Sequence, residues 1–147
     1  MMKKGWFLTS LIFISLFFLG SCSLSQADEL KVNFEKEFAL SVGQTAVFEE
    51  VELKIKFVSV SADSRCPQGV TCIWAGEAKC QVYIGNDRSF SLVDLTDGGG
   101  INGYSETIFK NANYNLKLAF KLAPYPEKDK QIDSGEYKLI LTVTRLG

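Results

Sequence analysis

Short runs in which apolar and polar residues alternate extend through most of this chain. A period of two is typical of a β-strand with one face buried and one face in water. The clearest run carries its apolar residues at every second position: Leu116, Leu118, Phe120 and Leu122. Seven or eight such runs, separated by turn residues, predict an all-β fold, a single antiparallel β-sandwich with a barrel as the alternative. The alternation disfavours a parallel sheet that is buried on both faces.

Two breaks in the pattern refine this prediction. Between residues 47 and 60 the apolar phase moves from Phe57 to Val58, which indicates a β-bulge or a strand buried on both faces. Gly85-Asn86-Asp87 predicts a hairpin turn between two strands. No convincing helical stripe occurs, and the segment 105–113 is the one place with room for a short helical turn.

The first 21 residues differ from the rest. Two lysines at positions 3 and 4 precede an almost wholly apolar run at 6–19, and two small residues follow it. A membrane-spanning helix needs about 20 apolar residues. The order of charge, apolar run and small residues is instead that of an export signal that is later removed.

Leu19-Gly20-Ser21-Cys22 resembles the bacterial lipobox, in which the cysteine becomes the acylated first residue of the mature protein. The resemblance implies a signal peptide at 1–21, a lipidated tether at 22–33 and a β-sandwich domain at 34–147. It also implies stable attachment to a membrane of the bacterial cell envelope, because two or more acyl chains anchor a protein firmly. Ser23 favours the outer membrane if the host has one. An ordinary signal peptide with a chance cysteine and an uncleaved anchor are the alternatives.

Export would place the remaining thiols where disulfides persist. Cys66 and Cys72 are six residues apart, with Pro67 and Gly69 between them to turn the chain, so we expect these cysteines to pair. Cys80 has the phase of the apolar residues in its strand, which predicts a buried free thiol. Pairing of Cys80 with either of the other two cysteines is the alternative.

The composition argues against several classes of function. The chain has no histidine, which removes histidine-based acid–base catalysis and histidine metal ligands. Its 16 basic and 17 acidic residues form no basic run of the kind that nucleic-acid binding needs. We therefore expect no enzymatic activity, no cofactor, no metal and no nucleic acid.

Two groups of residues carry side-chain oxygens that could serve a metal site or catalysis. Asp94, Asp97 and Asn102 surround a glycine-rich loop, but their spacing is not that of a known calcium motif, so a plain surface loop is expected. Glu49 and Glu50 are adjacent, and in a strand they would point to opposite faces. This argues against a catalytic pair of carboxylates, as in glycoside hydrolysis, and favours a solvated edge.

The stretch from Asp63 to Ala78 reads D-S-R-C-P-Q-G-V-T-C-I-W-A-G-E-A. It resembles the D-S-R-C-P-x-G-V-x-C-x-W-A-G-x-A pattern of small uncharacterised bacterial lipoproteins and secreted proteins. The resemblance covers about 16 residues. It implies an exported β-domain with a disulfide-closed loop, and it implies no reaction.

The candidate binding loop consists of Asp63, Arg65, Gln68 and Trp74. Arginine and tryptophan often anchor interfaces, so a closed loop that presents them predicts a binding module for a protein or an envelope component. A purely structural interpretation competes with this one: Asp63 and Arg65 satisfy nearby backbone groups, and Trp74 packs over the disulfide. A protease-inhibitor-like module that uses the tied loop and a structural envelope spacer are the alternative functions.

Overall fold

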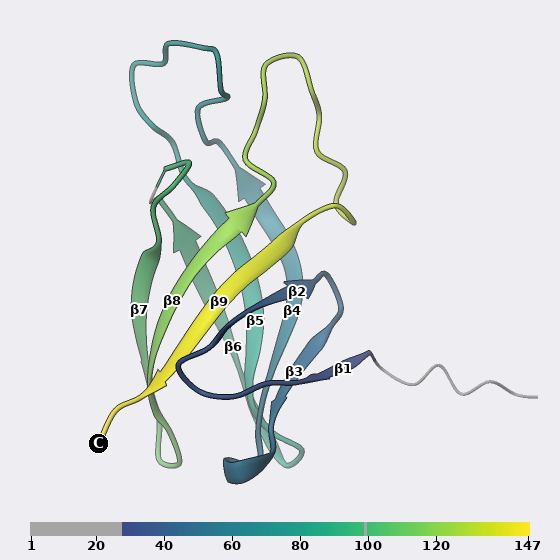
Figure 1. Ribbon diagram of the computed structural model, residues 1–147, viewed down its shortest axis with the longest axis vertical. Helices are drawn as coiled ribbons and strands as arrows, with labels where there is room; N and C mark the ends of the chain where they lie inside the picture. The colour runs from purple at the N-terminus through teal and green to yellow at the C-terminus, as the bar shows by residue number, and fades with distance from the viewer. Residues whose placement is uncertain (1–27, 99) are drawn as a thin grey trace, which may run out of the picture.

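The computed structural model describes residues 28–98 and 100–147 (Figure 1). The expected signal peptide, the acylated Cys22 and most of the expected tether lie outside the described residues. Within the described ranges, no helix is long and apolar enough to cross a membrane.

Two packed β-sheets form the domain, and they do not close into a barrel. The five-stranded sheet has the order β1-β3-β4-β5-β6, with bounds Glu29–Lys31, Thr45–Phe48, Leu53–Asp63, Ala78–Asn86 and Ser89–Asp97. The four-stranded sheet has the order β2-β9-β8-β7, with bounds Glu37–Ser41, Lys138–Arg145, Asn115–Ala123 and Ser105–Lys110. The structure confirms the predicted β-sandwich.

Apolar residues at alternate positions of both sheets meet between them. The fully buried side chains come from every strand except β1 and β7. Three phenylalanines, Phe48, Phe57 and Phe120, are the largest of them. The remaining large ones are aliphatic: Leu40, Leu53, Ile55, Ile84, Leu95, Leu116, Leu118, Leu139 and Leu141. The clearest period-two run of the sequence, from Leu116 to Leu122, is therefore buried as predicted, whereas Phe90 and Leu92 face outward.

The domain begins earlier than the sequence predicted. Glu29–Lys31 forms β1, which pairs in parallel with β3. Asp28 is also fixed, because its backbone carbonyl accepts a hydrogen bond from Thr45 N at 3.2 Å. Part of the expected 22–33 tether is therefore edge strand. The short apolar signal Leu30-Lys31-Val32 was too brief to be recognised as a strand.

Local expectations had mixed outcomes. The phase change in β4 is a bulge, since its register against β5 shifts between Phe57 and Ser59 and again before Ala62. The segment 105–113 contains no helical turn: Ser105–Lys110 is strand β7, paired with β8. Glu49 and Glu50 lie in a short 3₁₀ helix, η1 (Glu49–Val51), rather than in a strand.

Three connections rise above one end of the sandwich. They are the β4–β5 loop (64–77), the described part of the β6–β7 loop (98 and 100–104) and the β8–β9 loop (124–137). The β4–β5 loop, in teal, and the β8–β9 loop, in yellow-green, stand highest in Figure 1. Because the strands run alternately up and down, these three loops emerge at the same end, and the disulfide motif lies in the first of them.

Candidate functional site

Asp63 and Arg65 form a charge pair at the base of the loop end. Asp63 is the last residue of β4, and two residues later the chain turns the Arg65 side chain back over it. Arg65 Nε donates to Asp63 Oδ1 at 2.8 Å, and Arg65 Nη2 donates to Oδ2 at 2.6 Å. This two-pronged contact is the strongest geometry available to an arginine and a carboxylate.

The same guanidinium reaches the start of the β8–β9 loop. Arg65 Nη1 donates to the carbonyl of Leu122 at 2.6 Å, and Nη2 donates to the carbonyl of Pro124 at 3.0 Å. The Tyr125 ring covers the guanidinium, with its centroid 5.0 Å from Cζ. Arg65 therefore fastens β4 to the end of β8 in the other sheet.

Asp97, the last residue of β6, completes the network from a third strand. Its carboxylate accepts a hydrogen bond from Leu122 N at 2.8 Å and one from Ser105 Oγ at 3.2 Å. Asp97 Oδ2 also lies 3.8 Å from Arg65 Nη1, within ion-pair distance. Buried charges need such partners, and among the described residues every buried side-chain nitrogen and oxygen has one.

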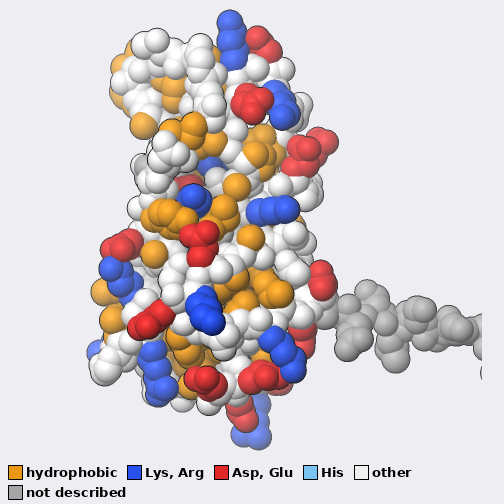
Figure 2. Space-filling model, viewed as in Figure 1, with side chains coloured by type: hydrophobic (Ala, Val, Ile, Leu, Met, Phe, Trp, Pro, Cys, Tyr) orange, Lys and Arg blue, Asp and Glu red, His pale blue; other side chains and the backbone are white. Residues whose placement is uncertain are grey.

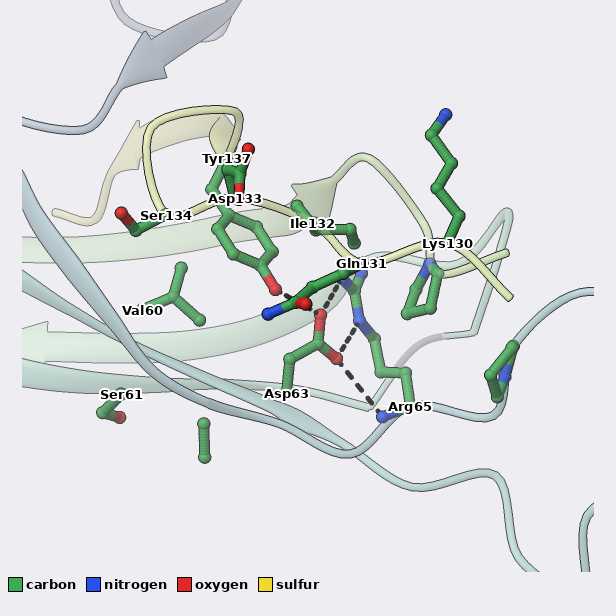
Figure 3. Close-up of a pocket in the computed structure, with 13 residues that line it drawn as sticks. Val60, Ser61, Asp63, Arg65, Lys130, Gln131, Ile132, Asp133, Ser134 and Tyr137 are labelled. Atoms are coloured by element: carbon green, nitrogen blue, oxygen red, sulfur yellow. Dashed lines mark hydrogen bonds and ion pairs between the residues drawn. The ribbon is translucent and has the colours of Figure 1, made fainter. Parts of the chain in front are cut away.

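Tyr137 closes the network from the far side of the β8–β9 loop. Its hydroxyl donates to Asp63 Oδ2 at 3.1 Å, as Figure 3 shows. Burial and the neighbouring Asp63 carboxylate raise the pKa of Tyr137 to about 12. Burial alone would raise the pKa of Asp63, but the hydrogen bonds and charge of Arg65 outweigh it and lower this pKa. Neither group is suited to transfer protons near neutral pH.

This geometry corrects one part of the candidate binding loop. Arg65 is only 5% exposed, so its guanidinium is not presented to a partner. Asp63 is half-buried and occupied by Arg65 and Tyr137. The structural interpretation of these two residues is therefore the correct one: they satisfy backbone groups and each other.

Above the network, the β4–β5 loop is closed in three ways. Cys66 and Cys72 form the predicted disulfide, with 6.0 Å between their Cα atoms. Cys66 N donates to the carbonyl of Ala75 at 2.7 Å, and Ser64 N donates to that of Glu77 at 2.8 Å. The two limbs of the loop thus continue the β4–β5 hairpin upward.

Gly76 is the residue that permits this close approach. Its φ is +70°, and a Cβ placed there would lie 1.9 Å from the carbonyl oxygen of Ser64. A side chain is excluded on both grounds, by backbone conformation and by space. The glycine of the W-A-G segment is therefore a requirement of the loop's own hairpin.

The β8–β9 loop holds the disulfide loop from the side. Gln68 N donates to the carbonyl of Pro126 at 2.9 Å, and Lys128 N donates to the carbonyl of Gln68 at 3.3 Å. These bonds make a short parallel bridge between Gln68 and Glu127. The backbone of Gln68 is engaged in this bridge while its side chain is exposed.

Beyond these fastenings the loop ends in an apolar tip, defined here as Val70, Ile73 and Trp74. Ile73 is 93% exposed, Trp74 is 79% exposed and Val70 is 42% exposed. No charged residue occurs from position 66 to position 76. In Figure 2 the upper left lobe accordingly carries no red or blue side chain, whereas the upper right lobe does.

The tip also corrects the structural interpretation of Trp74. Its exposed ring does not pack over the disulfide, so the expectation that it would do so is wrong. Ile73 is still more exposed and was not identified from the sequence. Cys72, Ile73 and Trp74 are consecutive apolar residues, so they do not alternate with polar residues as a strand would. The only sequence signal for Ile73 is its place beside a cysteine and a tryptophan in an uncharged segment.

An open groove of about 550 Å³ lies next to the network, between β4 and the β8–β9 loop. Asp63, Arg65 and Tyr137 form its floor, and Gln131 and Ile132 form part of its wall (Figure 3). The Lys130 side chain points away from the floor. Since Asp63 and Tyr137 already bind one another, the groove offers a ligand few free polar groups at its base.

The remaining predicted positions are placed as follows. Cys80 is a buried free thiol, as its phase predicted, and burial raises its pKa to about 12. Asp94 is exposed and accepts a hydrogen bond from Gln81, while Asp97 points inward, so these carboxylates do not share a site. No cluster of metal ligands occurs in residues 28–98 and 100–147.

Comparison with known proteins finds no match among family models, curated proteins or solved structures. The resemblance of the Asp63–Ala78 motif to small bacterial lipoproteins therefore stays a prediction.

Proposed function

We propose that this chain is a membrane-anchored lipoprotein of the bacterial envelope and that it is a binding module rather than an enzyme. Its contact with a protein or another envelope component is made by the tip Val70, Ile73 and Trp74. The observation that carries the proposal is the high exposure of Ile73 and Trp74 on a loop whose backbone is fixed from several sides.

The fastened backbone supports a binding role on energetic grounds. Ordering a loop on binding costs conformational entropy, and a loop that is already closed by a disulfide and hydrogen bonds avoids most of that cost. Tryptophan is among the residues that most often dominate interface energies. An apolar surface kept rigid and free of charge is more useful to a partner than to the isolated domain.

A site-specific photo-cross-linker at Ile73, in cells that make the full chain, tests this function. We expect one discrete adduct that is lost when Trp74→Ala is added. The matched control carries the cross-linker at Ile108, which is exposed on β7 and lies outside the tip. Identical adducts from both positions, or none from position 73, would contradict a specific contact and leave the spacer function.

Two further measurements resolve the parts of the proposal. Cys22→Ser should abolish labelling by a fatty-acid analogue, and persistent labelling would refute the anchor. A protease panel separates a general binding module from an inhibitor. Inhibition by the wild-type protein that disappears in Cys66→Ser would identify the partner as a protease.

A further inference from the structure

We propose that the outer face of the five-stranded sheet, at the end that carries the β5–β6 hairpin, rests on the membrane in which Cys22 is anchored. The contact is the β5–β6 patch, defined as Tyr83, Phe90 and Leu92 with Lys54 and Lys56. The tip, at the other end of the sheet, stays clear of lipid. This inference rests on the proposed acyl anchor and adds the orientation of the domain.

The patch is built from two neighbouring rows of side chains that cross the sheet. In one row Lys56 pairs with Tyr83, and Tyr83 pairs with Leu92. In the next row on the same face Lys54 pairs with Gly85, and Gly85 pairs with Phe90. Tyr83 and Phe90 touch edge to face, with centroids 6.3 Å apart. All three apolar side chains are substantially exposed.

The chain enters the domain in this same row. Glu29 pairs with Thr45, and Thr45 pairs with Lys56. Glu29, Thr45 and the patch residues Lys54, Lys56, Tyr83 and Phe90 line one groove of about 350 Å³ together with Asp87. The point at which the described chain begins therefore lies beside the patch.

The length of chain outside the described residues limits what can reach the bilayer. Six residues lead from Cys22 to Asp28, and even fully extended they span only about 20 Å. From Lys56 to Asp63 strand β4 rises away from this entry point by about 23 Å, and the disulfide loop lies beyond that. The patch is thus closer than the tip to Asp28, the point at which the tether joins the described domain.

The chemistry of the patch fits lipid headgroups. Tyrosine and other half-polar rings favour the membrane interface, and lysine side chains can lie along apolar surface with the ammonium in the headgroup layer. Lys56 has no acidic partner among the described residues, whereas Lys54 is neutralised by Glu29 and Asp87. A short tether supplies an effective concentration of about millimolar, so weak intrinsic affinity is enough to orient the domain.

The test uses the mature acylated protein in vesicles of phosphatidylethanolamine and phosphatidylglycerol that contain nitroxide-labelled lipid. Trp6 precedes Cys22, so Trp74 is the only tryptophan of the processed chain and reports on the tip. In the Trp74→Phe background, Phe90→Trp reports on the patch. Leu92→Trp, made separately in the Trp74→Phe background, repeats that measurement. Ile108→Trp in this background is the matched control on the other sheet.

We expect a blue shift and loss of emission at positions 90 and 92, with little loss at 74 or 108. Strongest quenching at position 74 would mean that the tip enters the bilayer, and it would overturn the proposal. A blue shift at position 90 without lipid quenching would mean that a second copy covers the patch, which also overturns it. Absence of the acyl group by mass spectrometry removes both anchor and orientation. An acylated protein with no quenching at position 90 refutes the orientation alone.

Discussion

Arg65 and Trp74 lie nine residues apart in one loop, and each occupies the environment that is usual for the other. The arginine is buried at the base of the loop, and the tryptophan is in water at its tip. The base, defined as Asp63, Arg65, Asp97 and Tyr137, is polar. Every buried side-chain donor and acceptor described there has a partner. The tip is apolar and uncharged, and it makes no comparable contact with the rest of the domain.

This difference separates what holds the loop from what the loop presents. Burial of a guanidinium is unfavourable unless carboxylates and carbonyls accept its hydrogen bonds, so the position of Arg65 is tied to the strands and loops that supply these groups. The exposed side chains of Ile73 and Trp74 contribute little to the free energy of folding, because folding removes little of their apolar surface from water. Substitutions at the base should therefore act on stability, and substitutions at the tip should act on binding.

Removal of the Arg65 guanidinium tests the base most severely. Arg65→Met should lower the free energy of unfolding by about 3–5 kcal/mol, because Asp63 and Asp97 lose their shared cation while they stay inside. Urea unfolding followed by circular dichroism measures the loss. Arg88→Met, in the exposed β5–β6 turn, is the matched control and should change stability by less than about 0.5 kcal/mol. Equal effects would contradict the structural role given to Arg65.

The close approach at Gly76 gives the next largest effect. Gly76→Ala should cost about 3 kcal/mol, since the new Cβ meets the Ser64 carbonyl and φ is positive. Gly69→Ala has a positive φ but open space around it, and should cost about 1 kcal/mol. Gly135→Ala has neither problem and is the neutral control. The same loss at Gly69 and Gly76 would show that contact with Ser64 is unimportant.

The disulfide links base and tip, and its removal should affect both. In the chain-entropy model a closed loop of seven residues stabilises by about 2–2.5 kcal/mol. The double variant Cys66→Ser with Cys72→Ser should lose this amount in urea unfolding, and the Trp74 fluorescence anisotropy should fall as the tip gains freedom. Reduction of the wild-type protein is the matched comparison. Unchanged anisotropy would show that the hydrogen bonds to Ala75 and Pro126 fix the tip by themselves.

The sequence predicted the parts of this loop that depend on local rules. Period-two alternation identified the strands on either side, and the cysteine spacing together with the expected export identified the Cys66–Cys72 pair. The free, buried Cys80 followed from its phase in β5. The sandwich itself followed from the number of strands and the turns between them.

The base could not be predicted, because it is assembled from three connections far apart in the sequence. Tyr137 reaches Asp63, and the carbonyls of Leu122 and Pro124 reach Arg65, only when both sheets are packed. An arginine beside a cysteine-closed turn looks like an exposed binding residue until its partners are known. For Trp74 the sequence left two expectations open, presentation to a partner and packing over the disulfide, because a tryptophan near a disulfide often has a core to pack against and this one does not.

Acid should lower the free energy of unfolding through Asp63 in the base. Arg65 lowers the pKa of Asp63 below its ordinary value, so the folded protein holds this carboxylate ionised more strongly than the unfolded chain does. The stability from this difference is fully present above about pH 4 and is lost as the pH falls through the folded-state pKa. Asp63→Asn should flatten the fall in unfolding free energy below pH 4. Asp129→Asn, in the exposed β8–β9 loop, should leave it intact, and identical curves for both variants would contradict the assignment.

The smallest expected effect on stability is at the tip, and it is the one that separates the two regions. Ile73→Ala and Trp74→Ala remove side chains that are already in water, so the free energy of unfolding should change by less than about 0.5 kcal/mol. Leu118→Ala, at a fully buried position, should cost about 2–5 kcal/mol in the same assay. The in-cell adduct from position 73 should nevertheless disappear in Trp74→Ala and persist in a core variant that still folds. A tip variant that loses stability as Leu118→Ala does would mean that the tip belongs to the fold after all, and the division between a bound base and a presented tip would fail.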